Sequence, residues 1–100
     1  MATKHITADI LRSRRTEILD MARKHGARKV RVFGSVARGD AGPDSDVDIL
    51  VELEPGRTLL DHARLLLDLQ RLLGCKVDVV TDRGLRPRIR DRVLLEAVPL

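Results

Sequence analysis

Three short segments of the chain have the hydrophobic pattern of β-strands. They lie at about 28–33, 46–53 and 75–81 and are rich in valine, isoleucine and leucine. In the second segment, alternate residues form one unbroken apolar face suited to a core: Val47, Ile49, Val51 and Leu53. Asp46 and Asp48 fall on the opposite face near the start of that strand, where we expect solvent and ligand to reach them.

Three longer segments repeat apolar residues with helical spacing, at about 8–25, 59–73 and 87–96. Residues that favour helix starts and stops stand at their ends. They are Thr7, Gly26, Thr58, Gly74 and Pro87. Strands and helices that follow one another through short connections predict an α/β fold.

The helix expected over 59–73 is unusual because leucine occupies most of its surface. Its charged residues form one narrow stripe along which acids and bases can pair: Asp61, Arg64, Asp68 and Arg71. An ordinary surface helix buries only one apolar stripe. Two interpretations stay open: either the first and last helices cover the leucines, or part of this helix contacts another protein.

The size and composition of the chain predict one domain, spanning 1–100, with one core, because only 43% of 100 residues are hydrophobic. No apolar run approaches the roughly 18 residues of a membrane span, and the first six residues lack a secretory pattern. The single Cys75 cannot form an internal disulfide, which fits a reducing compartment. We therefore expect a cytoplasmic protein without a membrane partner.

The formal net charge of +4 raises the question of a polyanionic partner. Nucleic-acid modules combine a clustered basic face with aromatic stacking platforms. Here Phe33 is the only aromatic residue, and it stands inside an apolar run. The composition argues against nucleic acid as a partner, and a basic nucleic-acid binder is kept only as a non-enzymatic alternative.

The stretch 33–51 carries the candidate chemistry. An apolar strand ends at Gly34 and Ser35, where a short helix can begin. Free backbone N–H groups at such a turn favour an anion, and glycine lets the anion approach the backbone closely. Asp46 and Asp48 point to the same side of a strand and repel each other unless a cation offsets them. An anion cradle beside a cation site is what a nucleoside triphosphate requires.

A purely structural interpretation exists for each of these residues. Gly34 and Ser35 by themselves describe an ordinary strand-to-helix turn, and acidic residues near turns are often simply solvated. Arg38 follows Ser35 by one helical turn, so it can reach a triphosphate or form an ion pair with Asp40 or Asp44. The combination, rather than any one residue, favours phosphate and metal binding.

Three segments together resemble the signature of the minimal nucleotidyltransferases of the DNA polymerase β superfamily. They are Gly34-Ser35, Arg38-Gly39-Asp40 and Ser45-Asp46-Val47-Asp48, and the stretch 89–100 resembles the last helix and tail of that family. The resemblance implies a nucleotidyltransferase core with a small mixed β-sheet and packed helices. It implies a third carboxylate on a later strand, matched here by Asp78. The implied catalytic and metal-binding residues are Asp46, Asp48 and Asp78, and the nucleotide-binding residues are Gly34, Ser35 and Arg38.

The resemblance also implies a reaction. Two divalent ions, Mg²⁺ or Mn²⁺, would assist transfer of AMP from ATP to a hydroxyl, with Asp78 accepting the proton. A chain of this length leaves no room for an acceptor domain, so we expect a partner to bring the acceptor. Stand-alone members of the family are antitoxins paired with helical HEPN ribonuclease toxins, so the implied acceptor is a tyrosine of such a toxin.

Two further interpretations remain. In the first, the protein is a binding-only antitoxin that neutralises its partner by contact, with an unused acidic site. In the second, it modifies a small molecule or an RNA end together with a detachable helical subunit. No residue visibly reads the base of the nucleotide, and the sequence does not fix the oligomeric state.

Overall fold

The computed structural model describes residues 6–42 and 44–100 and has a four-stranded β-sheet at its centre. The strands lie in the order β3-β2-β1-β4. β2 pairs antiparallel with β1 and parallel with β3, and β4 pairs antiparallel with β1. The bounds are β1 Ala27–Phe33, β2 Val47–Leu53, β3 Val77–Thr81 and β4 Val98–Pro99. The expected α/β fold with a small mixed sheet is confirmed, and β4 is a strand that the sequence pattern did not predict.

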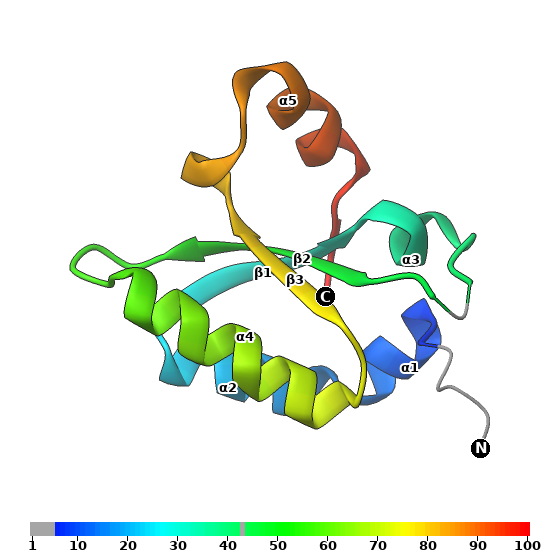
Figure 1. Ribbon diagram of the computed structural model, residues 1–100, viewed down its shortest axis with the longest axis horizontal. Coiled ribbons are helices and arrows are strands. Elements are labelled where there is room, and N and C mark those ends of the chain that lie inside the picture. The colour runs from blue at the N-terminus through cyan, green and yellow to red at the C-terminus, as the bar shows by residue number, and fades with distance from the viewer. Residues whose placement is uncertain (1–5, 43) are drawn as a thin grey trace.

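Helices lie on both faces of this sheet (Figure 1). α1, α2 and α4 form a layer on one face, α5 stands over the other face, and α3 lies at one end directly after β1. The bounds are α1 Ala8–Ser13, α2 Arg15–Lys24, α3 Gly34–Arg38, α4 Leu59–Leu73, the 3₁₀ turn η1 Asp82–Gly84 and α5 Pro87–Glu96. None of the described helices has the length and apolar content needed to cross a bilayer. Most of the N-terminal segment used for the secretory prediction lies outside the described residues.

The single N-terminal helix expected over about 8–25 is wrong: the structure has two helices, α1 and α2, separated at Arg14. The Ser13 hydroxyl donates to the Ile10 carbonyl at 2.6 Å, and the Arg14 guanidinium donates to the Leu72 carbonyl at the end of α4 at 3.3 Å. Such side-chain bonds to the backbone compete with the helical ladder. Hydrophobic periodicity does not report them, so the break was not predictable from it.

The main core lies between the sheet and the layer formed by α1, α2 and α4. Val47, Ile49 and Val51 of β2 face this core and are at most 1% exposed. The α4 residues of the same cluster are Leu65, Leu69 and Leu73. Leu50 is also buried but lies outside this cluster, because its side chain points to the face under α5. The alternation read from the sequence therefore separates a core face from a second face on which the carboxylates lie.

α4 buries only part of its leucine surface. Leu59, Leu60 and Leu67 remain 83%, 58% and 51% exposed. α2 packs against α4, with His25 Nε2 2.7 Å from Asp68 Oδ2, but α5 lies across the sheet from α4 (Figure 1). The interpretation in which the last helix helps to cover these leucines is therefore wrong. We call Leu59, Leu60 and Leu67 the α4 patch.

Candidate active site at the start of strands β2 and β3

Strand register brings the candidate residues together at one end of the sheet. Phe33 of β1 pairs with Asp48 of β2, and Asp48 pairs with Asp78 of β3. Gly34 and Ser35 follow Phe33 directly, so the turn into α3 leaves the sheet beside Asp48. Two carboxylates on neighbouring strands and a backbone turn thus form one row.

The backbone at Gly34 lies very close to the Asp48 side chain. The Gly34 φ of +74° lies in the left-handed region, where residues with a side chain are strained. A Cβ added at Gly34 would overlap Asp48 Oδ2, whereas a Cβ added at Gly39 would meet nothing within 4 Å. The hydroxyl of the half-buried Ser35 has no hydrogen-bond partner among the described residues. The turn therefore presents a close backbone and an unpaired hydroxyl beside a carboxylate.

The pKa of Asp48 is raised by its surroundings. Partial burial, followed by the charges of Asp78 and Asp46, raises the pKa of Asp48 from 3.8 to about 6, and the Arg38 charge partly opposes this. Its raised pKa shows that nearby positive charge does not compensate the negative charge at this position. A bound cation would supply the missing compensation.

The donor chemistry of the three aspartates fits a hard divalent cation. Asp46 is half-buried just before β2, and Asp78 is exposed on the edge strand β3. In the described part of the chain, no three acidic, histidine or cysteine side chains are grouped to hold a metal ion by themselves. Mg²⁺ is ordinarily bound by one or two carboxylates together with phosphate oxygens and water. The row therefore suits an ion that arrives with a phosphate-bearing ligand, rather than an ion held by protein ligands alone.

Arg38 lies at the end of α3 and is held by two acids. Its Nε donates to Asp40 Oδ2 at 3.2 Å, and its Nη1 donates to Glu96 Oε1 of α5. These two hydrogen bonds raise the pKa of the guanidinium above its ordinary value. The ion pair with Asp40 is one of the alternatives that the sequence offered, and no ion pair with Asp44 occurs among the described residues. Glu96 was missed, because a partner 58 positions away has no local sequence signal.

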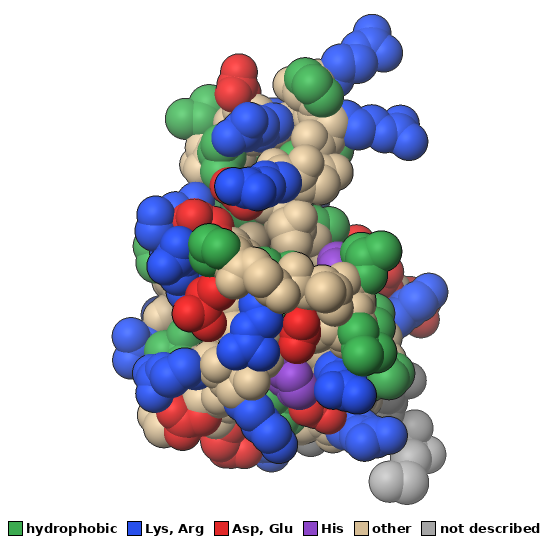
Figure 2. Space-filling view, turned by 90° about the vertical axis from the view of Figure 1, so that its left-hand side faces the viewer, with side chains coloured by type: hydrophobic (Ala, Val, Ile, Leu, Met, Phe, Trp, Pro, Cys, Tyr) green, Lys and Arg blue, Asp and Glu red, His purple; other side chains and the backbone are tan. Residues whose placement is uncertain are grey.

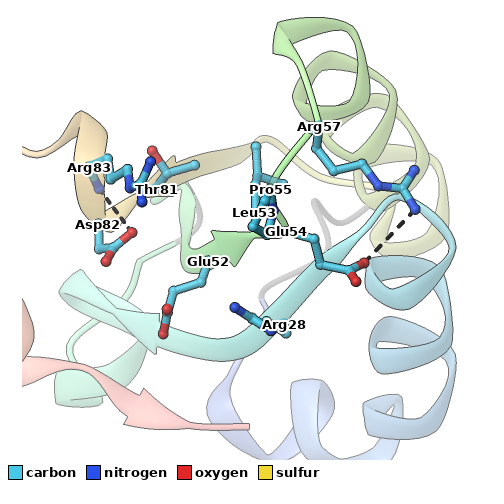
Figure 3. A pocket seen from close by; sticks show the side chains of 10 residues that line it. Arg28, Glu52, Leu53, Glu54, Pro55, Arg57, Thr81, Asp82 and Arg83 are labelled. Atoms are coloured by element: carbon cyan, nitrogen blue, oxygen red, sulfur yellow. Dashed lines mark hydrogen bonds and ion pairs between the residues drawn. The ribbon is translucent and has the colours of Figure 1, made fainter.

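A separate cavity of about 340 Å³ lies at the opposite end of β2 and β3. Acidic and basic side chains surround it (Figure 3). Part of this charge is already paired, since Arg57 Nη2 lies 3.9 Å from Glu54 Oε1 and Lys29 Nζ lies 3.0 Å from Glu52 Oε2. None of the residues that line it was proposed as a site residue from the sequence. They are Arg28, Glu52, Leu53, Glu54, Pro55, Gly56, Arg57, Thr81, Asp82 and Arg83.

The fold and the row of carboxylates define a class of protein. The model of the nucleotidyltransferase domain matches residues 15–100, so the chain belongs to the nucleotidyltransferase family. This confirms the resemblance drawn from the motifs and identifies the protein as a member of an enzyme family.

Two of the similar proteins in this family are named as protein adenylyltransferases. The chain is 44% identical over 82 residues to a candidate protein adenylyltransferase of Methanocaldococcus jannaschii, covering 82% of this chain and 88% of the relative. It is 43% identical over 79 residues to the protein adenylyltransferase MntA of Thermococcus cleftensis, covering 79% of this chain and 80% of the relative.

Solved structures have the same fold as this chain. A candidate minimal nucleotidyltransferase superposes with a TM-score of 0.87 at 59% identity, covering 97% of this chain and 99% of the other. A chain from a toxin–antitoxin crystal structure with AMP-PNP has a TM-score of 0.73 at 22% identity, covering 84% of this chain and 69% of the other, and supports the fold alone.

Proposed function

We propose that residues 1–100 form one nucleotidyltransferase domain that transfers AMP from ATP to a hydroxyl of a partner protein. The observation that carries this proposal is the row formed by Asp48, Asp78 and the Gly34–Ser35 turn. Asp46, Asp48 and Asp78 would hold two divalent ions, Mg²⁺ or Mn²⁺, together with the phosphate oxygens of ATP. These ions would polarise the phosphoryl group and offset the charge of the leaving pyrophosphate.

The residues of the chain have separate parts in this transfer. The backbone amides at Gly34 and Ser35 and the Ser35 hydroxyl bind the terminal phosphates, and Arg38 adds positive charge. The acceptor oxygen bonds to the α-phosphorus while the bond to the bridging oxygen breaks and pyrophosphate leaves. Asp78 accepts the proton of the acceptor hydroxyl. Its exposure on an edge strand gives a large acceptor access to it.

The names of the relatives support a protein as the acceptor. Protein adenylyltransferases are 43–44% identical to this chain, and the solved neighbours include toxin–antitoxin complexes. We propose that the partner is a helical HEPN-type toxin, that the acceptor is one of its tyrosine hydroxyls, and that the modification in the cytoplasm makes this chain an antitoxin. The names of the relatives support the identity of the partner, whereas the geometry of the site supports the transfer chemistry.

Two faces of the molecule are available for contacts with a partner. The α4 patch lies on the face of the sheet opposite the carboxylates, so a protein bound only there does not reach Asp48. α5 lies on the same face as the carboxylates and carries exposed arginines, and Lys and Arg side chains stand out from the upper part of the molecule, where α5 lies (Figure 2). We propose that the acceptor approaches over α5 and α3. The α4 patch then contacts a second part of the same partner.

The alternative is a binding-only antitoxin. The α4 patch favours it, because exposed leucines on a well-packed helix are an interface feature that needs no catalysis. The two functions differ in one property: neutralisation by contact does not depend on the aspartates, whereas neutralisation by adenylylation does.

Transfer of label from [α-³²P]ATP tests the proposal. The protein is incubated with Mg²⁺ and with a purified helical HEPN-type toxin, the class of partner proposed above. Wild type labels that protein, while the double variant Asp46→Asn, Asp48→Asn loses at least about 10²-fold in rate, as expected when a metal clamp is removed. Asp82→Asn, an acid at the opposite end of the sheet, keeps the rate. If the Asn variants neutralise the partner as well as wild type and no label is transferred, the binding-only function is correct.

A further inference from the structure

One ion pair joins the candidate active site to the C-terminal helix. Arg38 at the end of α3 donates from Nη1 to Glu96, the last residue of α5. The Glu96 side chain is 21% exposed and that of Arg38 is 49% exposed, so the contact is half-sheltered and one side of the guanidinium remains open to solvent.

The two acids occupy two separate parts of the guanidinium. Asp40 accepts from Nε at 3.2 Å and Glu96 accepts from Nη1, while Nη2 has no hydrogen-bond partner among the described residues. An arginine held in this way keeps its plane and its position, yet still offers donors to an incoming anion. Arg38 also lies close enough to Asp48 for its charge to act on that carboxylate.

We propose that Glu96 is a positioning residue for nucleotide binding: together with Asp40 it holds Arg38 in place to meet the polyphosphate of ATP. This inference rests on the proposed function. A free arginine side chain has many rotamers, and fixing one of them on binding costs affinity. Glu96 holds the Arg38 side chain in one rotamer before the nucleotide binds. The entropy of that side chain is therefore lost during folding and does not weaken nucleotide binding.

A purely structural role for Glu96 makes a different prediction. In that case the residue only ties α5 to α3, and its loss disturbs α5 whether or not Arg38 is present. A double-mutant cycle separates the two roles, because coupling between Glu96 and Arg38 appears only when one acts through the other.

The experiment measures the dissociation constant of ATP by titration calorimetry, with Mg²⁺ and again with EDTA, in the absence of any acceptor. Glu96→Ala weakens binding about threefold to tenfold, the cost of one ordered side chain. Glu96→Gln keeps an oxygen acceptor for Arg38 and stays within about twofold of wild type. Arg38→Ala weakens binding at least as much as Glu96→Ala, and adding Glu96→Ala to it has no further effect. Glu52→Ala removes a comparable ion pair, that with Lys29, at the other end of the strand and leaves binding unchanged.

Three results overturn the inference while the proposed function stands: wild type binds ATP and Glu96→Ala binds it equally well, Arg38→Ala binds it equally well, or Glu96→Ala weakens binding by the same factor with and without Arg38. If wild type does not bind ATP under either condition, the proposed function fails as well.

Discussion

At the scale of single residues, Gly34 sets the spacing between the turn into α3 and strand β2. Its left-handed backbone and its contact with Asp48 Oδ2 leave no space for a side chain. From the Gly-Ser pair, the sequence analysis expected a bound anion to approach the backbone here, whereas the group that the structure places against Gly34 is the Asp48 carboxylate. The sequence could not predict which group approaches, because that depends on the pairing of Phe33 with Asp48 across β1 and β2.

Gly34→Ala is therefore predicted to be more harmful than Gly39→Ala. Both glycines have positive φ, +74° and +82°, so both substitutions carry the backbone cost of about 1–2 kcal/mol. Only the alanine at Gly34 also displaces the Asp48 carboxylate. We expect similar losses of unfolding free energy in urea for the two variants, with ATP binding lost in Gly34→Ala and retained in Gly39→Ala. Equal nucleotide affinity in both variants would show that the close approach has no function.

The raised pKa of Asp48 predicts a pH dependence of stability. The pKa of about 6 in the folded protein lies above the ordinary value of 3.8, so the folded state holds this proton more tightly than the unfolded state. The stabilisation of the folded state by this proton is fully present below about pH 4. It declines as the pH rises and is lost above about pH 6. Asp48→Asn carries no such proton, so its unfolding midpoint in urea should rise relative to wild type between pH 4 and pH 6.5.

Asp61→Asn serves as a control of opposite sign. A hydrogen bond from the backbone N–H of Thr58 is the main cause that lowers the pKa of Asp61. The contribution of Asp61 is present at neutral pH and lost in acid, so this variant should be less stable than wild type at pH 7 and approach it as the pH falls. If the urea midpoint of Asp48→Asn equals that of wild type at every pH, burial and the neighbouring carboxylates do not raise the pKa of Asp48.

At the scale of elements, hydrophobic periodicity was most reliable where local signals agree. α4 spans 59–73 as expected, because the Thr58 capping box and the left-handed Gly74 fix both of its ends. β4 pairs with β1 through only two residues, Val98 and Pro99, too few for any pattern to identify. The break at Arg14 and the strand β4 both depend on contacts between distant segments.

α4 also gives a test of which leucines belong to the fold. Leu69 is 1% exposed in the core, whereas Leu67, two residues earlier, is 51% exposed. Leu69→Ala is predicted to lower the unfolding free energy by about 2–5 kcal/mol in urea titrations. Leu67→Gln should stay within about 0.5 kcal/mol of wild type and weaken only the association with the partner protein. A large loss of stability in Leu67→Gln would mean that the patch belongs to the core of this chain.

At the scale of the whole molecule, the sheet has a core face and an opposite face that carries the candidate carboxylates. The sequence placed Val47, Ile49 and Val51 on the core side by their alternation, and Asp46 and Asp48 on the other. It placed Asp78 only through the family resemblance, since alternation does not say which strands are neighbours. The parallel pairing of β2 with β3 supplies that information. α5, which follows β3 in the chain, lies over the face of the carboxylates (Figure 1).

The row formed by Asp48, Asp78 and the Gly34–Ser35 turn lies at the opposite end of β2 and β3 from the 340 Å³ cavity lined by Arg28 and Arg83. Size does not decide where a nucleotide binds, because a cavity of about 370 Å³ is lined in part by Arg38 and Gly39. Chemistry favours the row, because among the described residues only the row combines an uncompensated carboxylate, Asp48, with a close backbone turn. The proposed function therefore depends on where the nucleotide binds.

A crystal structure with Mn²⁺ and a non-hydrolysable ATP analogue is the most direct test. We expect an anomalous peak for manganese within ligand distance of carboxylate oxygens of Asp46 and Asp48, and the terminal phosphates against Gly34 and Ser35. Nucleotide density in the cavity between Arg28 and Arg83, or manganese bound without Asp48, would contradict the proposed function.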